Sequence, residues 1–83
     1  MSQSNLNETR PPTLVDARQL ACPQPVLMLR QALKQMLKGE QVTLLTTDPM
    51  ASVDVRAFCL RAGHTLLLEV TSGNYSSFSV ERR

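Results

Sequence analysis

The sequence predicts an α+β fold, a two-layer α/β sandwich with the order β-α-β-α-β-β, in which a four-stranded mixed sheet carries two helices on one face. Two segments with apolar residues at helical spacing, 23–39 and 50–62, alternate with short β-rich runs. Right-handed crossovers between parallel strands would place both helices on one side of the sheet. Ser72-Gly73-Asn74 is typical of a turn and predicts a closing antiparallel hairpin.

Length and composition limit the kind of protein. Residues 1–12 are polar and end in two prolines, so we predict a disordered leader before a single domain over residues 13–83. A chain of 83 residues that is 42% hydrophobic has room for one small core. The net charge of +2 is too low to predict a direct nucleic-acid surface. Without a signal-like or membrane-spanning apolar run, we expect a cytoplasmic protein.

The first half of the chain contains the first two strands and the first helix. Residues 13–17 form a short apolar run and are predicted to be the first strand, with a turn over 18–21. The helix is expected to begin at Pro23 and to end at Gly39, its C′ residue. A β-branched run over 41–47 predicts the second strand. The predicted buried stripe of this helix is Val26, Leu29, Leu33, Met36 and Leu37.

The second half contains a helix and the hairpin. Residues 50–62 predict a helix that Gly63 ends, followed by strands over 65–71 and 75–82. Alternation in the last strand places Phe78 and Val80 on the buried face, so serine and threonine positions should face outward. The predicted buried stripe of this helix is Val55, Phe58, Cys59 and Ala62.

Cys22 lies where the first helix should begin. Pro23 and Pro25 hold φ near the helical value, and a proline's missing N–H is tolerated in the first turn, so Cys22 is predicted to be the N-cap. The free amides and the helix dipole should favour a thiolate there, lowering the thiol pKa by less than about one unit. Such a thiol suits a group that accepts and passes on sulfur. The alternative is a small buried side chain that caps a helix.

The remaining residues argue against other cysteine chemistry. A dithiol redox motif would place its second cysteine where Pro25 stands. Cys59 lies on the apolar stripe of the second helix, so we favour core packing over a resolving thiol. His64 follows a helix end, and we favour a turn role over a Cys-His pair. Two cysteines and one histidine at these separations match no zinc pattern, so no metal is expected.

Two aspartates stand near the start of the second helix. Asp48 is predicted to be its N-cap, with a role beside the thiol loop as the alternative. Asp54 is expected to form a solvated pair with Arg56 or Arg61.

Other candidate residues follow Cys22 along the first helix. Met28 is expected to complete the core, whereas Leu27 belongs either to the core or to an exposed docking surface. Arg30 and Lys34 lie one turn apart. Charges of this kind usually form a solvated helix face. A cationic rim near the thiol would also steer the protein toward an acidic partner and stabilise an anionic persulfide, so we favour docking.

A set of motif residues runs through the chain: Asp16, Leu20-Ala21-Cys22-Pro23-Gln24-Pro25, Arg30, Gly39-Glu40, Thr47-Asp48-Pro49, Asp54-Val55, Phe58-Cys59 and Gly63-His64. In the order and spacing of these residues, the chain resembles the TusA/SirA family of small sulfur-carrier proteins, from about Leu14 to the C-terminus. It departs from the family pattern at Gln19, usually Gly, and at Arg56, often Pro. A side chain at Gln19 narrows the loop conformations next to Cys22 and is expected to affect partner choice more than sulfur chemistry.

The resemblance implies a two-layered sandwich like the C-terminal domain of the third bacterial translation initiation factor. It also implies a sulfurtransferase that works in a relay rather than as a stand-alone enzyme. Cys22, supported by Pro23, Pro25 and Asp48, would accept persulfide sulfur from a cysteine desulfurase or another donor and pass it to an acceptor protein. The transient persulfide would be the only cofactor. Family members serve tRNA thiolation, molybdenum cofactor maturation and related sulfur trafficking.

Two other functions compete with the sulfur relay. A regulatory interaction module would bind a protein partner through Leu27, Arg30 and Lys34 and use no sulfur chemistry. Direct RNA binding through the sheet is the weaker alternative, because the chain offers few stacking residues beyond Tyr75 and Phe78.

Overall fold

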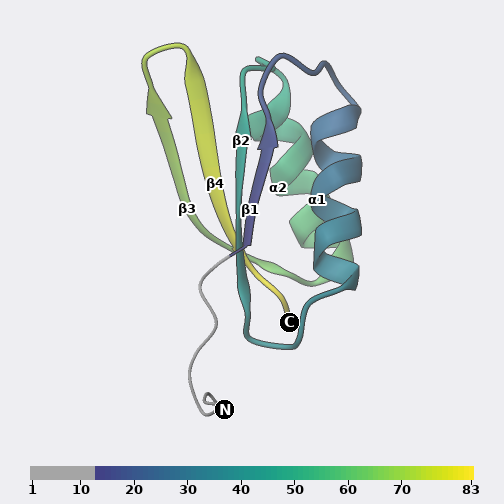
Figure 1. Cartoon of the computed structure of the whole chain (residues 1–83). Coiled ribbons are helices and arrows are strands. Elements are labelled where there is room, and N and C mark those ends of the chain that lie inside the picture. Colours follow the sequence, from purple (N-terminus) through teal and green to yellow (C-terminus); the bar gives the residue numbers. More distant parts are fainter. Residues whose placement is uncertain (1–12) are drawn as a thin grey trace, which may run out of the picture.

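A four-stranded mixed sheet with two helices on one face forms the fold (Figure 1). The structure is a computed structural model that describes residues 13–83, so the leader predicted over residues 1–12 lies outside it. The strand order is β1-β2-β4-β3; β1 and β2 are parallel, and β4 is antiparallel to both neighbours. The predicted fold class is confirmed. The elements are β1 (Thr13–Ala17), α1 (Gln24–Lys34), β2 (Gln41–Thr46), α2 (Ala51–Ala62), β3 (Thr65–Ser72) and β4 (Tyr75–Glu81).

The core lies between the helices and the central strands. Phe78 and Val80 of β4 are fully buried, as their alternation predicted, and pair across the sheet with Leu44 and Val42 of β2. Burying aliphatic and aromatic side chains of this size stabilises the fold by roughly 1.5–3 kcal/mol each. The other buried hydrophobic residues are Ala17, Leu29, Leu33, Met36, Ala51, Val55 and Cys59.

Helix α1 is shorter than predicted at both ends. It begins at Gln24 with Pro23 as its N-cap, and it ends at Lys34, so the prediction that Gly39 terminates it is wrong. Leu37, predicted to be buried, is 65% exposed, whereas Met36 packs into the core beyond the helix end.

The early end of α1 has a tertiary cause. Arg82, beyond the end of β4, donates from Nε to the carbonyl of Leu33 at 2.9 Å and so satisfies one of the last carbonyls of the helix. The N–H of Leu37 is bonded to the carboxylate of Glu40, and the N–H of Gly39 to the carbonyl of Arg82. These partners replace the helical hydrogen bonds that would have continued α1.

Helix α2 ends where the sequence predicts. Gly63 has φ +82°, and its N–H and that of His64 both bond the carbonyl of Cys59. Only glycine adopts this left-handed conformation freely, which explains the stop. The buried stripe is Ala51, Val55 and Cys59, spaced four residues apart, so the predicted burial of Ala62 is wrong.

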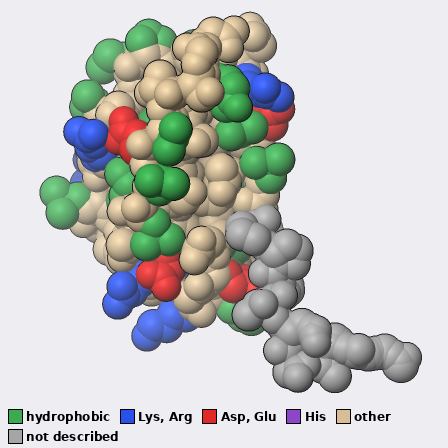
Figure 2. Space-filling model, turned by 90° about the vertical axis from the view of Figure 1, so that its left-hand side faces the viewer, with side chains coloured by type: hydrophobic (Ala, Val, Ile, Leu, Met, Phe, Trp, Pro, Cys, Tyr) green, Lys and Arg blue, Asp and Glu red, His purple; other side chains and the backbone are tan. Residues whose placement is uncertain are grey.

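The other face of the sheet has no helix over it. Leu14, Leu68 and Val70 are 63%, 57% and 41% exposed, and Ser77 and Ser79 alternate with the buried residues of β4. Figure 2, seen from the side away from the helices, shows hydrophobic side chains interspersed with polar ones and charges near the rim. Within residues 13–83, neither helix is long and apolar enough to cross a membrane.

Candidate functional site

Two loops and the start of α2 meet at one edge of the sheet. Because β1 and β2 run parallel in register, with Ala17 opposite Thr46, their carboxyl ends lie side by side. The β1–α1 loop leaves one strand and the β2–α2 loop leaves the other. A hydrogen bond from the N–H of Gln19 to Thr47 Oγ1, 2.9 Å long, ties the two loops together. The β1–α1 loop therefore lies beside the loop that leads into α2.

Cys22 is exposed in the β1–α1 loop. It precedes the N-cap Pro23 by one residue, so the prediction that it caps the helix itself is wrong. The Cys22–Pro23 peptide bond is cis. Pro25 occupies the second helical position and is buried against the core, which anchors the helix start directly after the thiol.

The Cys22 thiol is hydrogen-bonded to a carboxylate. Its Sγ donates to Asp54 Oδ2 at 2.9 Å. The Cys22 sulfur and one carboxylate oxygen each of Asp48 and Asp54 all lie within 4.8 Å of one another. Asp54 was expected to pair with Arg56 or Arg61, and this is wrong, because Arg56 binds Glu69 instead. Sequence reasoning missed the contact, although the parallel pairing of the first two strands was a signal that could have located it.

The charge around the thiol opposes its ionisation. The hydrogen bond to Asp54 raises the pKa of Cys22 above its ordinary value, with further contributions from burial and from the negative charges of Asp54 and Asp48. The sequence predicted a lowered pKa from the helix dipole. That effect is modest, and two carboxylates outweigh it. The Cys22 thiol therefore ionises less readily than an ordinary cysteine.

Asp48 does not cap α2 as predicted. The N-cap is Met50, and Asp48 Oδ1 accepts the N–H of Met50 at 3.3 Å in a local turn across Pro49. The other oxygen, Oδ2, is buried and has no hydrogen-bond partner among the described residues. Asp48 does lie beside Cys22 and Asp54, and the alternative, a role near the thiol loop, stays a prediction.

The other titratable candidates lie elsewhere. Cys59 is 3% exposed in the core, as predicted, and burial raises its pKa. His64 follows the C-terminal end of α2, opposite the end that carries Asp54, and its Nδ1 accepts the N–H of Arg83. Burial lowers the pKa of His64, with a smaller effect from Arg82. Neither Cys59 nor His64 therefore belongs to a site with Cys22. The Sγ–Oδ2 hydrogen bond already explains the close approach of Asp54 to Cys22, so we assign no metal to this site.

The predicted docking residues share one face of α1. Leu27, Arg30 and Lys34 recur at helical spacing and are all exposed, Leu27 to 44%. Arg30 and Lys34 also border a shallow cleft of about 170 Å³ that Leu27 does not line. The other residues lining this cleft are Leu33, Phe58, Ala62, His64 and Arg82.

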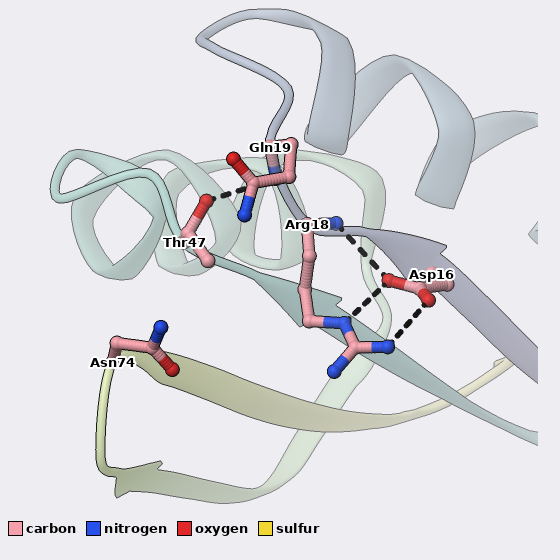
Figure 3. A pocket seen from close by; sticks show the side chains of 5 residues that line it. All are labelled: Asp16, Arg18, Gln19, Thr47 and Asn74. Atoms are coloured by element: carbon pink, nitrogen blue, oxygen red, sulfur yellow. Dashed lines mark hydrogen bonds and ion pairs between the residues drawn. The ribbon is translucent and has the colours of Figure 1, made fainter.

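A polar hollow of about 360 Å³ opens beside the two loops (Figure 3). Arg18 binds Asp16 through two side-chain hydrogen bonds of 2.9 and 2.8 Å, which lowers the pKa of Asp16 to about 2. Asn74, from the β3–β4 turn, faces Arg18 across the hollow. Thr47 and Asn74 also line a second hollow of about 290 Å³ that reaches Asp48. The thiol loop is thus flanked by polar, open surface.

One comparison with known proteins bears on this site. A family model described as Sulfurtransferase TusA matches residues 13–82. The match spans every strand and helix of the structure and both loops that meet at Cys22.

Proposed function

Because the chain belongs to the TusA family of sulfurtransferases, we propose that it carries sulfur as a persulfide on Cys22 and relays it to an acceptor protein. One observation supports this choice of residue. Cys22 is exposed on a loop that other proteins can reach, whereas Cys59 lies 3% exposed in the core. A sulfur that must enter a donor's active site and then an acceptor's has to stand on such a surface.

The proposed chemistry requires only the thiol and a donor. Sγ of Cys22 attacks the outer sulfur of a donor persulfide, an S–S bond forms on Cys22, and the donor sulfur leaves with its electron pair. An acceptor sulfur then repeats the exchange on the loaded carrier. Since each step moves one sulfur atom between thiols without net oxidation, the transient persulfide is the only cofactor that we propose.

The donor is a cysteine desulfurase or another protein that forms a persulfide, and both partners work with the carrier in the cytoplasm. The proposed destinations are tRNA thiolation, molybdenum cofactor maturation or a related sulfur pathway. In each, the protein acts as a relay rather than as a stand-alone enzyme.

Partner docking is assigned to Leu27, Arg30 and Lys34. An exposed apolar side chain beside two cations on α1, the helix that begins directly after the thiol loop, is suited to an acidic, partly apolar partner surface. Arg30→Glu and Lys34→Glu should slow sulfur transfer from the partner, most at low salt, while leaving the reaction of Cys22 with small alkylating agents unchanged.

Intact mass spectrometry tests the carrier function. The wild-type protein, incubated with a cysteine desulfurase and cysteine, should gain one sulfur atom that dithiothreitol removes. Cys59→Ser should load in the same way, and Cys22→Ser should not load. An unmodified wild-type protein, or a loaded Cys22→Ser protein, would contradict the proposal. Full activity of Cys22→Ala in a deletion strain, with loss in Arg30→Glu, would favour the regulatory module instead.

A further inference from the structure

The hydrogen bond between Cys22 and Asp54 depends on the thiol proton. Sγ donates a proton to Asp54 Oδ2 at 2.9 Å, and the two residues stand 32 positions apart on different elements. Asp48 adds a second carboxylate beside the thiol. The Cys22 sulfur and one oxygen of each aspartate lie within 4.8 Å of one another. In a persulfide, Sγ is bonded to the outer sulfur and has no proton to donate. Loading therefore abolishes this hydrogen bond.

We infer that Asp54 biases the carrier toward releasing its sulfur, because it holds the thiol proton of the empty carrier and repels the charge of the loaded one. This inference rests on the proposed carrier function. Asp54 contacts the reacting sulfur itself. It lies near the start of α2, and the buried side chains of α2 hold this helix against the core.

The loading step balances with a persulfide donor alone. Cys22–SH and R–S–SH give Cys22–S–SH and R–SH. As Sγ attacks the outer sulfur, the thiol proton passes to Asp54 Oδ2, the new Sγ–S bond forms, and the donor S–S bond breaks. The donor thiolate leaves with the electron pair and takes up the proton from Asp54. Discharge to an acceptor thiol is the same sequence in reverse.

The carboxylates act against the loaded state. The outer sulfur of a persulfide lies about 2.05 Å beyond Sγ and carries negative charge when ionised. Asp54 and Asp48 repel that charge, while the empty carrier regains a hydrogen bond to a charged acceptor. Both effects favour the empty form, so sulfur that reaches Cys22 is passed on rather than stored. The cationic residues Arg30 and Lys34 lie further along α1, beside the cleft between the helices.

An equilibrium measurement tests the bias. Wild type, Asp54→Asn and Asp48→Asn are incubated with a fixed ratio of cysteine persulfide to cysteine in buffer with EDTA, and intact mass gives the loaded fraction. Asparagine keeps the shape of aspartate and removes its charge. The loaded-to-empty ratio should rise roughly fivefold in Asp54→Asn. It should rise less in Asp48→Asn, because the hydrogen bond of Sγ is to Asp54 and not to Asp48.

A matched control carries the same charge change at a remote site. Glu81 lies at the end of β4 and pairs with Arg83, so Glu81→Gln should load as wild type does. The pH profile of Cys22 alkylation, followed on its own peptide, is the second readout. Asp54→Asn should react roughly fivefold faster than wild type at pH 7, and its profile should shift to lower pH.

The outcomes separate the two proposals. A wild-type protein that never loads overturns the carrier function. A wild-type protein that loads, with an Asp54→Asn variant equal to it in loaded fraction and pH profile, overturns the role of Asp54 alone. Should Asp54→Asn fail to fold, the pH profile of Cys22 alkylation in the wild-type protein tests the inference instead. The midpoint of that profile must lie at a higher pH than the midpoint for a cysteine in an unstructured peptide. A midpoint at or below that of the peptide cysteine refutes the inference.

Discussion

Replacing Gln19 with glycine should stabilise the protein. Gln19 has φ +74°, the one non-glycine residue in the left-handed region among residues 13–83. A side chain in this conformation costs about 1–2 kcal/mol, because Cβ crowds the following carbonyl. Glycine removes that cost. It also gives the unfolded chain more freedom, which destabilises the fold by about 0.4–1 kcal/mol. Taken from the middle of each range, the net gain should be about 0.8 kcal/mol.

The contacts of Gln19 do not offset this gain. Its hydrogen bond to Thr47 Oγ1 uses the backbone N–H, which glycine retains. For a domain of this size, the gain corresponds to a melting temperature higher by about 3–6 °C. Urea unfolding of the wild type and the Gln19→Gly variant, followed by circular dichroism, measures the difference in free energy directly.

Gln19→Ala is the matched control. It removes the amide side chain but keeps Cβ and therefore keeps the cost of the left-handed backbone. It should remain within about 0.5 kcal/mol of wild type. If Gln19→Gly is no more stable than Gln19→Ala, backbone strain at this position contributes nothing, and the reasoning is refuted.

Three further predictions concern the core, an ion pair and the second cysteine. Phe78→Ala should lower the free energy of unfolding by about 3–5 kcal/mol, since Phe78 is fully buried, and a loss under 1 kcal/mol in urea unfolding would contradict its central packing. The Asp16 carboxyl should titrate at about 2 by NMR and near 3.8 in Arg18→Ala; because its pKa is lowered on folding, the pair stabilises the fold above the unfolded pKa and loses this effect as pH falls toward 2. Cys59→Ser should lower stability by about 1–3 kcal/mol, because it buries a hydroxyl, yet accept sulfur like wild type; loss of loading in a folded Cys59→Ser protein would argue for a resolving role.

Local patterns predicted most of the fold. The first strand was predicted with its observed bounds, and the second strand, the second helix and the hairpin strands to within one residue, because periodicity and the Gly63 stop are properties of neighbouring residues. The end of the first helix was not predicted. One of its last carbonyls, that of Leu33, accepts a hydrogen bond from Arg82, 49 residues away, and no local signal marks such a partner.

The site was predicted less completely than the fold. Cys22 was identified from the two prolines that follow it, and its exposure agrees with that choice. The predicted direction of the Cys22 pKa shift was wrong. The helix dipole is a local effect, whereas Asp54 approaches from another helix. A pKa depends on every charge that the fold brings near, so it follows from the tertiary structure rather than from the helix that carries the residue.

The position of β4 in the sheet affects the order in which the domain can fold during synthesis. In the sheet, β4 lies between β2 and β3, which share no pairing with each other. During synthesis, β3 emerges before the strand that joins it to the rest of the sheet. Until β4 is available, only β1 and β2 have partners, and the core lacks Phe78 and Val80. Cys22, although close to the beginning of the domain, thus stands above a core that is complete only once β4 has been synthesised.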